Sequence, residues 1–151
     1  MRKILDDGLK LFTVSTAYIL LSSVYFSFLW HSRIAMQLGT IIGIGFLGLW
    51  FYYGLKLKMG FIKGLMVGLM GAAGGILLAG FSLVMVLKDL ESAFWFMIPW
   101  TYPFVGIFEV IPYPGVIDNY LPHISVIIVV VLTALGSWAG KARSCCSRMN
   151  G

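Results

Sequence analysis

Few residues of this chain could carry chemistry. Glu91, Glu109 and Asp118 share one long connection, and His31 and His123 stand at the ends of apolar runs. Imidazole and carboxylate groups are common ligands of zinc and other transition metals. The sequence has no H-x-x-x-H, C-x-x-C or E-x-x-H spacing, so the two histidines are only weak candidates for metal ligands. We predict that the protein carries no metal and no cofactor.

An enzyme needs a nucleophile with a base, or paired carboxylates, at one place. The hydroxyls of Thr16, Ser23 and Ser27 have no neighbouring base, and Glu109 and Asp118 could pair only through folding of their segment. We therefore expect a protein without catalytic residues. A membrane enzyme or redox protein that uses the outer histidines and carboxylates is the third alternative.

Two adjacent cysteines, Cys145 and Cys146, lie near the C-terminus. Neighbouring residues are poorly placed to bridge each other, and two thiols form no disulfide framework. Their position beside an apolar run suits palmitoylation in a eukaryote and reduced thiols in a bacterium, so their role stays open.

The stretch GIGFLG, residues 43–48, matches the G-x-G-x-x-G pattern of dinucleotide-binding turns. That turn requires a preceding strand, and its backbone N–H groups must be free to bind a pyrophosphate. Here the pattern lies inside a long apolar run, where the N–H groups are committed to a helix. We predict no nucleotide binding.

The composition indicates a membrane protein. The 151 residues are 60% hydrophobic and 11% charged, whereas soluble domains average roughly 25% charged residues. The net charge of +5 could suggest nucleic acid. The basic residues form no stripe with interleaved aromatic residues, however, so we expect contact with anionic lipid and none with nucleic acid.

Four charge-free apolar runs predict four transmembrane helices in a single domain. They cover residues 11–30, 34–55, 64–87 and 124–140. Each has about the length needed to cross a ~30 Å hydrocarbon core, although the last is short. The first run is too long for a signal peptide, and no A-x-A site follows it. The fold class is therefore an all-α integral membrane protein.

The basic residues predict the orientation. Nine Lys and Arg residues lie in the N-terminal tail, the second connection and the tail at residues 141–151, against two in the other connections. Under the positive-inside rule both termini are cytoplasmic. We expect a multi-pass protein of the plasma membrane, in a bacterium the inner membrane.

Small residues mark faces for close helix packing. In the third run they recur at i, i+4, i+7 and i+11 and share one face. In the second run, one pair of glycines lies opposite another. The predicted interface residues are Gly64, Gly68, Gly71, Gly75, Ala79, Ser82, Gly39, Gly43, Gly45 and Gly48. Such faces could hold the monomer together, join copies or partners, or line a pathway.

The connection at residues 88–123 is long, with a net charge of −3, and is rich in aromatic residues and proline. Residues 92–111 could form a fifth span, but two prolines interrupt them and a fifth crossing would contradict the charge pattern. We expect an interfacial or re-entrant segment broken at Pro99 and Pro103. The candidates for contact with a ligand or partner are Trp95, Trp100, Tyr102, Phe104 and Glu109.

These observations predict a small non-enzymatic membrane protein that acts by helix–helix association. It would be an accessory or assembly subunit of a larger membrane complex, and its partners would be the lipid bilayer with other membrane subunits or further copies of itself. The alternative is a self-oligomerising transporter or holin-like pore with the long connection as its gate. No span contains Asp, Glu, Lys, Arg or His, which argues against ion-coupled transport.

Overall fold

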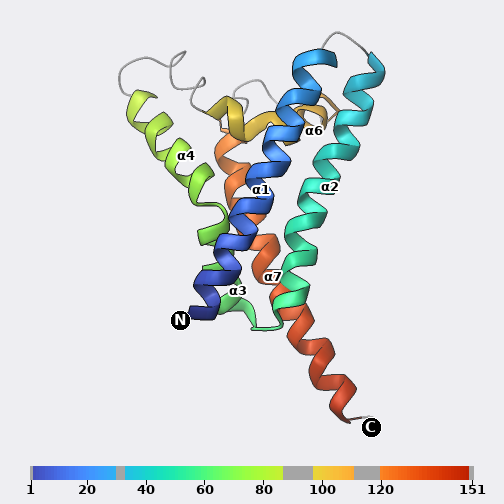
Figure 1. Ribbon diagram of the computed structural model, residues 1–151, viewed down its shortest axis with the longest axis vertical. Coiled ribbons are helices and arrows are strands. Elements are labelled where there is room, and N and C mark those ends of the chain that lie inside the picture. Colours follow the sequence, from blue (N-terminus) through green and yellow to red (C-terminus); the bar gives the residue numbers. More distant parts are fainter. Residues whose placement is uncertain (1, 30–32, 87–96, 111–119, 150–151) are drawn as a thin grey trace.

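The computed structural model describes residues 2–29, 33–86, 97–110 and 120–149 (Figure 1). Within these ranges all regular secondary structure is helical. Its elements are α1 (Arg2–Leu29), α2 (Arg33–Leu57), α3 (Phe61–Gly71), α4 (Ala73–Val86), a helical stretch at residues 97–101, the 3-10 helix η1 (Tyr102–Phe104), α6 (Val105–Val110) and α7 (Leu121–Met149).

Three helices, α1, α2 and α7, are long and apolar enough to cross a membrane, and α3 with α4 makes a fourth candidate if the bent pair counts as one span. The predicted all-helical architecture with several apolar spans is confirmed at this level. Insertion in a membrane and the sides of the termini stay predictions. The helix α7 continues to Met149, so most of the basic tail extends the last helix.

The third predicted span is not one straight helix. α3 and α4 meet at Ala72 with a bend of 66°, and α4 diverges from α1 and α2 (Figure 1). Residues 71–75 read GAAGG, and a run of small residues offers little side-chain packing to keep a helix straight. The expectation of a single continuous span over residues 64–87 is therefore corrected to a bent pair.

Ala72, at the bend, keeps both of its backbone groups hydrogen-bonded. The N–H of Ala72 donates to Gly68 O, and the N–H of Ile76 donates to Ala72 O, both at 2.9 Å. From α1, the buried Ser15 hydroxyl reaches Gly71 O at 3.5 Å. Away from water each unpaired backbone group would cost free energy, so this local pairing makes a bend tolerable inside a bundle.

The described part of the long connection, residues 97–110, enters the bundle. Met97, Trp100 and Phe104 are buried in the main hydrophobic core with Phe46 and Trp50 of α2. Helical structure covers Pro99, and the change from α to 3-10 geometry comes at Tyr102, one residue before Pro103. The predicted break at Pro99 is therefore not seen within residues 97–101.

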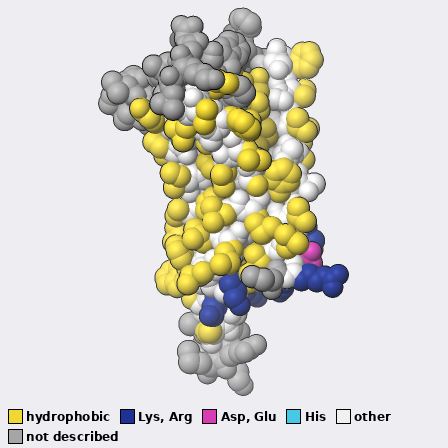
Figure 2. All heavy atoms as spheres, turned by 90° about the vertical axis from the view of Figure 1, so that its left-hand side faces the viewer, with side chains coloured by type: hydrophobic (Ala, Val, Ile, Leu, Met, Phe, Trp, Pro, Cys, Tyr) yellow, Lys and Arg dark blue, Asp and Glu magenta, His cyan; other side chains and the backbone are white. Residues whose placement is uncertain are grey.

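The outside of the bundle is apolar. Large hydrophobic side chains are exposed along every long helix, among them Leu21 at 72%, Phe28 at 83% and Ile41 at 65%. Figure 2 shows them as a continuous band on one face, with Lys and Arg gathered along its lower edge. Exposing such a surface to water is energetically unfavourable, whereas it is compatible with the hydrocarbon core of a bilayer.

Candidate functional site

The glycine face predicted on the third span packs against the chain itself. In α3, a Cβ added at Gly64 would lie 2.5 Å from Ser137 Cβ, and one at Gly68 would lie 3.0 Å from Val130 O; both neighbours belong to α7. Beyond them, Gly71 faces Leu11 of α1. These three glycines therefore let α7 and α1 approach the backbone of α3 closely.

Past the bend, the same face meets the segment at residues 97–110. A Cβ at Gly75 would lie 2.7 Å from the ring of Trp100. Ala79 packs against the core, and Ser82 is buried. The face that was expected to be continuous thus contacts three different parts of the chain in turn. Contact of these six residues with a partner stays a prediction, and for Gly64, Gly68, Gly71 and Gly75 it would require these internal contacts to be exchanged.

The two glycine pairs of α2 lie in different surroundings. Gly39 faces Phe26 and Gly106, and Gly43 faces Ile107 and the carbonyl of Pro103. The Thr40 hydroxyl adds a hydrogen bond to Gly106 O at 2.9 Å. The segment at residues 97–110 therefore packs against this side of α2.

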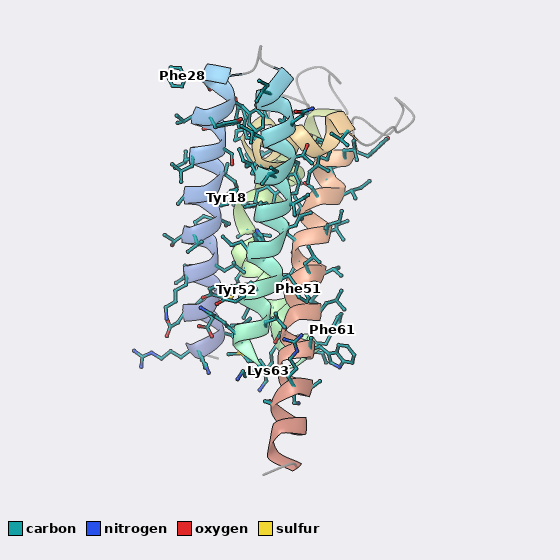
Figure 3. The ribbon with its side chains drawn as sticks, turned by 90° about the vertical axis from the view of Figure 1, so that its right-hand side faces the viewer. Tyr18, Phe28, Phe51, Tyr52, Phe61 and Lys63 are labelled. Atoms are coloured by element: carbon teal, nitrogen blue, oxygen red, sulfur yellow. The ribbon has the colours of Figure 1, made fainter. Side chains whose placement is uncertain are left out.

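The opposite side of α2 is covered only in part. Gly45 accommodates Tyr18, whose hydroxyl would lie 2.9 Å from an added Cβ and donates to Ile42 O at 2.7 Å; Figure 3 shows Tyr18 between α1 and α2. At Gly48, and at Gly80 on α4, no described atom beyond the adjacent residues and the helix's own backbone lies within 4 Å of an added Cβ. No described residue covers these two positions.

A close crossing of α2 and α7 involves glycines that sequence reasoning missed. Gly54 of α2 faces the backbone of Thr133 and Gly136, and Gly140 faces the backbone of Leu55. The signal was present, since residues 136–140 read GSWAG, a G-x-x-x-G pattern. Such a pattern lets two backbones touch and gain dispersion and Cα–H···O contacts.

Trp100 belongs to an aromatic cluster around Phe46 of α2. Its ring centroid lies 6.2 Å from that of Phe46 and 6.5 Å from that of Trp50, both edge to face, and Phe104 lies 5.4 Å from Phe46. The indole N–H donates to Ser125 Oγ of α7 at 3.0 Å. Trp100 therefore ties the segment at residues 97–110 to α2, α4 and α7 at once.

This burial bears on the predicted outer contact residues. Trp100 and Phe104 are each 3% exposed and are covered by the chain's own helices, whereas Tyr102 is half-buried. Trp95 and the Glu109 side chain lie outside the described residues. Binding of a ligand or partner by this set stays a prediction, and Tyr102 is its most accessible described member.

The candidate metal residues are only partly placed. His123 lies half-buried on α7, and His31, Glu91 and Asp118 fall outside the described residues. Within the described ranges, no three His, Cys, Asp or Glu side chains come together in a group that could hold a metal ion.

Comparison of this chain with protein families, with curated proteins and with solved structures finds no match.

Proposed function

We propose that this chain is a small multi-pass membrane protein that acts without catalysis, by helix–helix association, as a subunit of a larger membrane assembly. The observation that carries the proposal is the open face around Gly48. A glycine inside a helix costs roughly 1 kcal/mol relative to alanine. On the same helix, close neighbours leave no room for a side chain at Gly39, Gly43 and Gly54, which explains glycine there. No such neighbour explains the glycine at position 48.

An open glycine suits the approach of another helix. Lipid tails are as apolar as leucine, so helices associate in a membrane through close van der Waals packing, which small residues permit. Gly48 is flanked on the exposed side of α2 by Ile44 and Phe51, and Gly80 offers a similar position on α4 between Leu77 and Phe81. These two positions are the proposed contact points.

The test is purification of the tagged full chain from native membranes in mild detergent, followed by mass and identity of what travels with it. We expect a stoichiometric membrane subunit or a discrete oligomer with the native sequence and its loss in Gly48→Leu. Because no described residue beyond its own stretch of helix lies within 4 Å of an added Cβ at this position, the variant should still fold.

The matched control is Ala17→Leu, which enlarges another exposed small residue, on α1. It should assemble as the native chain does. If the native chain purifies alone as a monomer, the proposal is wrong. If both variants lose assembly, the loss comes from a larger side chain anywhere on the surface and not from Gly48.

The second candidate is a small transporter or pore. What favours it is the bend at Ala72 beside the inserted segment at residues 97–110, because broken helices and inserted segments recur where transporters bind their substrates. Flux through proteoliposomes that contain only this chain tests it. We expect flux under this alternative and none under the first proposal.

A further inference from the structure

The described basic side chains gather at one end of the bundle. Lys58, Lys63 and Lys141 are exposed there and are called the lysine patch below. In Figure 3, Lys63 and Phe61 lie at the lower end of the bundle. In Figure 2, Lys and Arg side chains lie along the lower edge of the apolar band.

Packing brings the three lysines together from separate elements. The turn between α2 and α3 has positive φ at Lys58 (52°) and Gly60 (88°), and it is held to α7 by a bond from the N–H of Met59 to Ser137 Oγ at 3.2 Å. The Lys141 side chain lies over Gly60, with Cδ 3.4 Å and Nζ 3.7 Å from where a Cβ would be. Lys63 stands in the first turn of α3.

This arrangement concentrates positive charge on elements that contain no acidic residue of their own. Gly60 caps α3 with no side-chain hydrogen bond, and the first turn has no acidic residue. The start of a helix carries a partial positive charge that favours anions, yet Lys141 Nζ lies beside it. The helices α2, α3, α4 and α7 contain no Asp or Glu, so no carboxylate of these elements can balance the patch.

The basic residues of α1 differ in this respect. Arg2, Lys3 and Lys10 share their helix with Asp6 and Asp7. These residues are three or four positions apart, where opposite charges on a helix attract. Two groups of three cations thus lie at the same end of the bundle, and only one of them has carboxylates on its own helix.

We propose that the lysine patch binds the phosphate headgroups of anionic phospholipids. Exposed apolar side chains adjoin it, namely Ile62 of α3 at 69% and Trp138 of α7 at 59%. An amphiphile with a negative head and acyl chains matches both the cations and these apolar neighbours. This inference goes beyond the proposed function, because lipid binding needs no protein partner.

The size of the effect follows from surface electrostatics. Each lysine near an anionic headgroup strengthens binding by about fivefold, so the loss of three should weaken it by about 100-fold. Added salt should weaken binding by the native chain, since exposed charges are screened.

The experiment uses the purified full chain in nanodiscs of phosphatidylglycerol and phosphatidylcholine in equal amounts, with retained lipids identified by native mass spectrometry. The native chain should keep phosphatidylglycerol preferentially. The triple variant Lys58→Gln, Lys63→Gln, Lys141→Gln should lose this preference, and the triple Lys→Arg variant at the same positions should keep it.

The matched control is Arg2→Gln, Lys3→Gln, Lys10→Gln, which removes the same charge from α1 and should keep the preference. Equal loss in both glutamine triples, or no preference in the native chain, would overturn the proposal. Circular dichroism checks folding, and if the patch triple does not fold, Lys141→Gln alone should show the loss of about fivefold.

Discussion

Two buried tryptophans of the core differ in the hydrogen bonding of their indole N–H. That of Trp100 donates to Ser125 Oγ, which itself donates to Pro122 O at 2.6 Å. That of Trp50 is buried with no nitrogen or oxygen partner among the described residues. A buried donor without a partner lowers stability, so the two residues should respond differently to the same substitution.

We expect Trp100→Phe to destabilise the fold more than Trp50→Phe, by about 1 kcal/mol. Both changes remove the same atoms from the core, and only the first breaks a hydrogen bond. The free energy of unfolding in detergent, followed by circular dichroism, measures the difference.

Ser125→Ala provides the control, because it leaves the Trp100 N–H in place without its acceptor. It should destabilise the native chain and have little effect in the Trp100→Phe background. Equal costs in both backgrounds would show that the hydrogen bond contributes nothing measurable.

At the scale of the helices, the crossing of α2 and α7 depends on contact between backbones. Gly54 and Gly136 face each other there, and a Cβ at Gly136 would lie 3.1 Å from Gly54 Cα. Neither backbone can shift without moving a whole helix, unlike the end of a flexible side chain.

We expect Gly54→Leu to destabilise the fold by about 3 kcal/mol or more, because overpacking here has no local relief. Gly48→Leu makes the same change on the open face of the same helix and should leave monomer stability nearly unchanged. Thermal unfolding of both variants in detergent tests this. Similar melting temperatures for the two would contradict the close crossing.

The bend between α3 and α4 is a second property of the helices. The Trp100 ring lies against Gly75 of α4 and also contacts Phe46 and Trp50 of α2. It therefore lies between Gly75 of α4 and the aromatic side chains of α2.

We expect Trp100→Ala to bring α4 towards α2. Spin labels at the exposed positions Leu83 and Ile41 should report a shorter distance in this variant than with Trp100 in place. An unchanged distance would mean that the small residues 71–75 set the bend by themselves.

At the scale of the whole molecule, the orientation in the membrane is the main prediction. The N-terminus, the α2–α3 turn and the basic part of α7 lie at one end of the bundle (Figure 1). By the positive-inside rule we expect this end to face the cytoplasm.

We expect Cys145, which is exposed, to resist an impermeant maleimide in intact cells and to react after permeabilisation. The control is Asp118→Cys in a chain with both native cysteines changed to serine, which should react in intact cells. Labelling of Cys145 from outside would reverse the orientation.

The sequence by itself determined the helical class, three of the four apolar spans and the end at which the cations gather. These properties follow from composition and from the length of charge-free runs, which depend on neighbouring residues alone. The spacing of Gly64, Gly68 and Gly71 also indicated a face for close packing, although it did not indicate which helix packs there.

Only the tertiary structure decided the bend at Ala72, the burial of Trp100 and Phe104, and which glycines are covered. A glycine permits close approach on any face, so covered Gly43 and open Gly48 look alike in a sequence. Likewise, an aromatic segment with prolines suits an interface as well as a core. Whether the segment at residues 97–110 lies at an interface or in the core depends on the space left by Gly39, Gly43 and Gly75, which are distant from it along the chain.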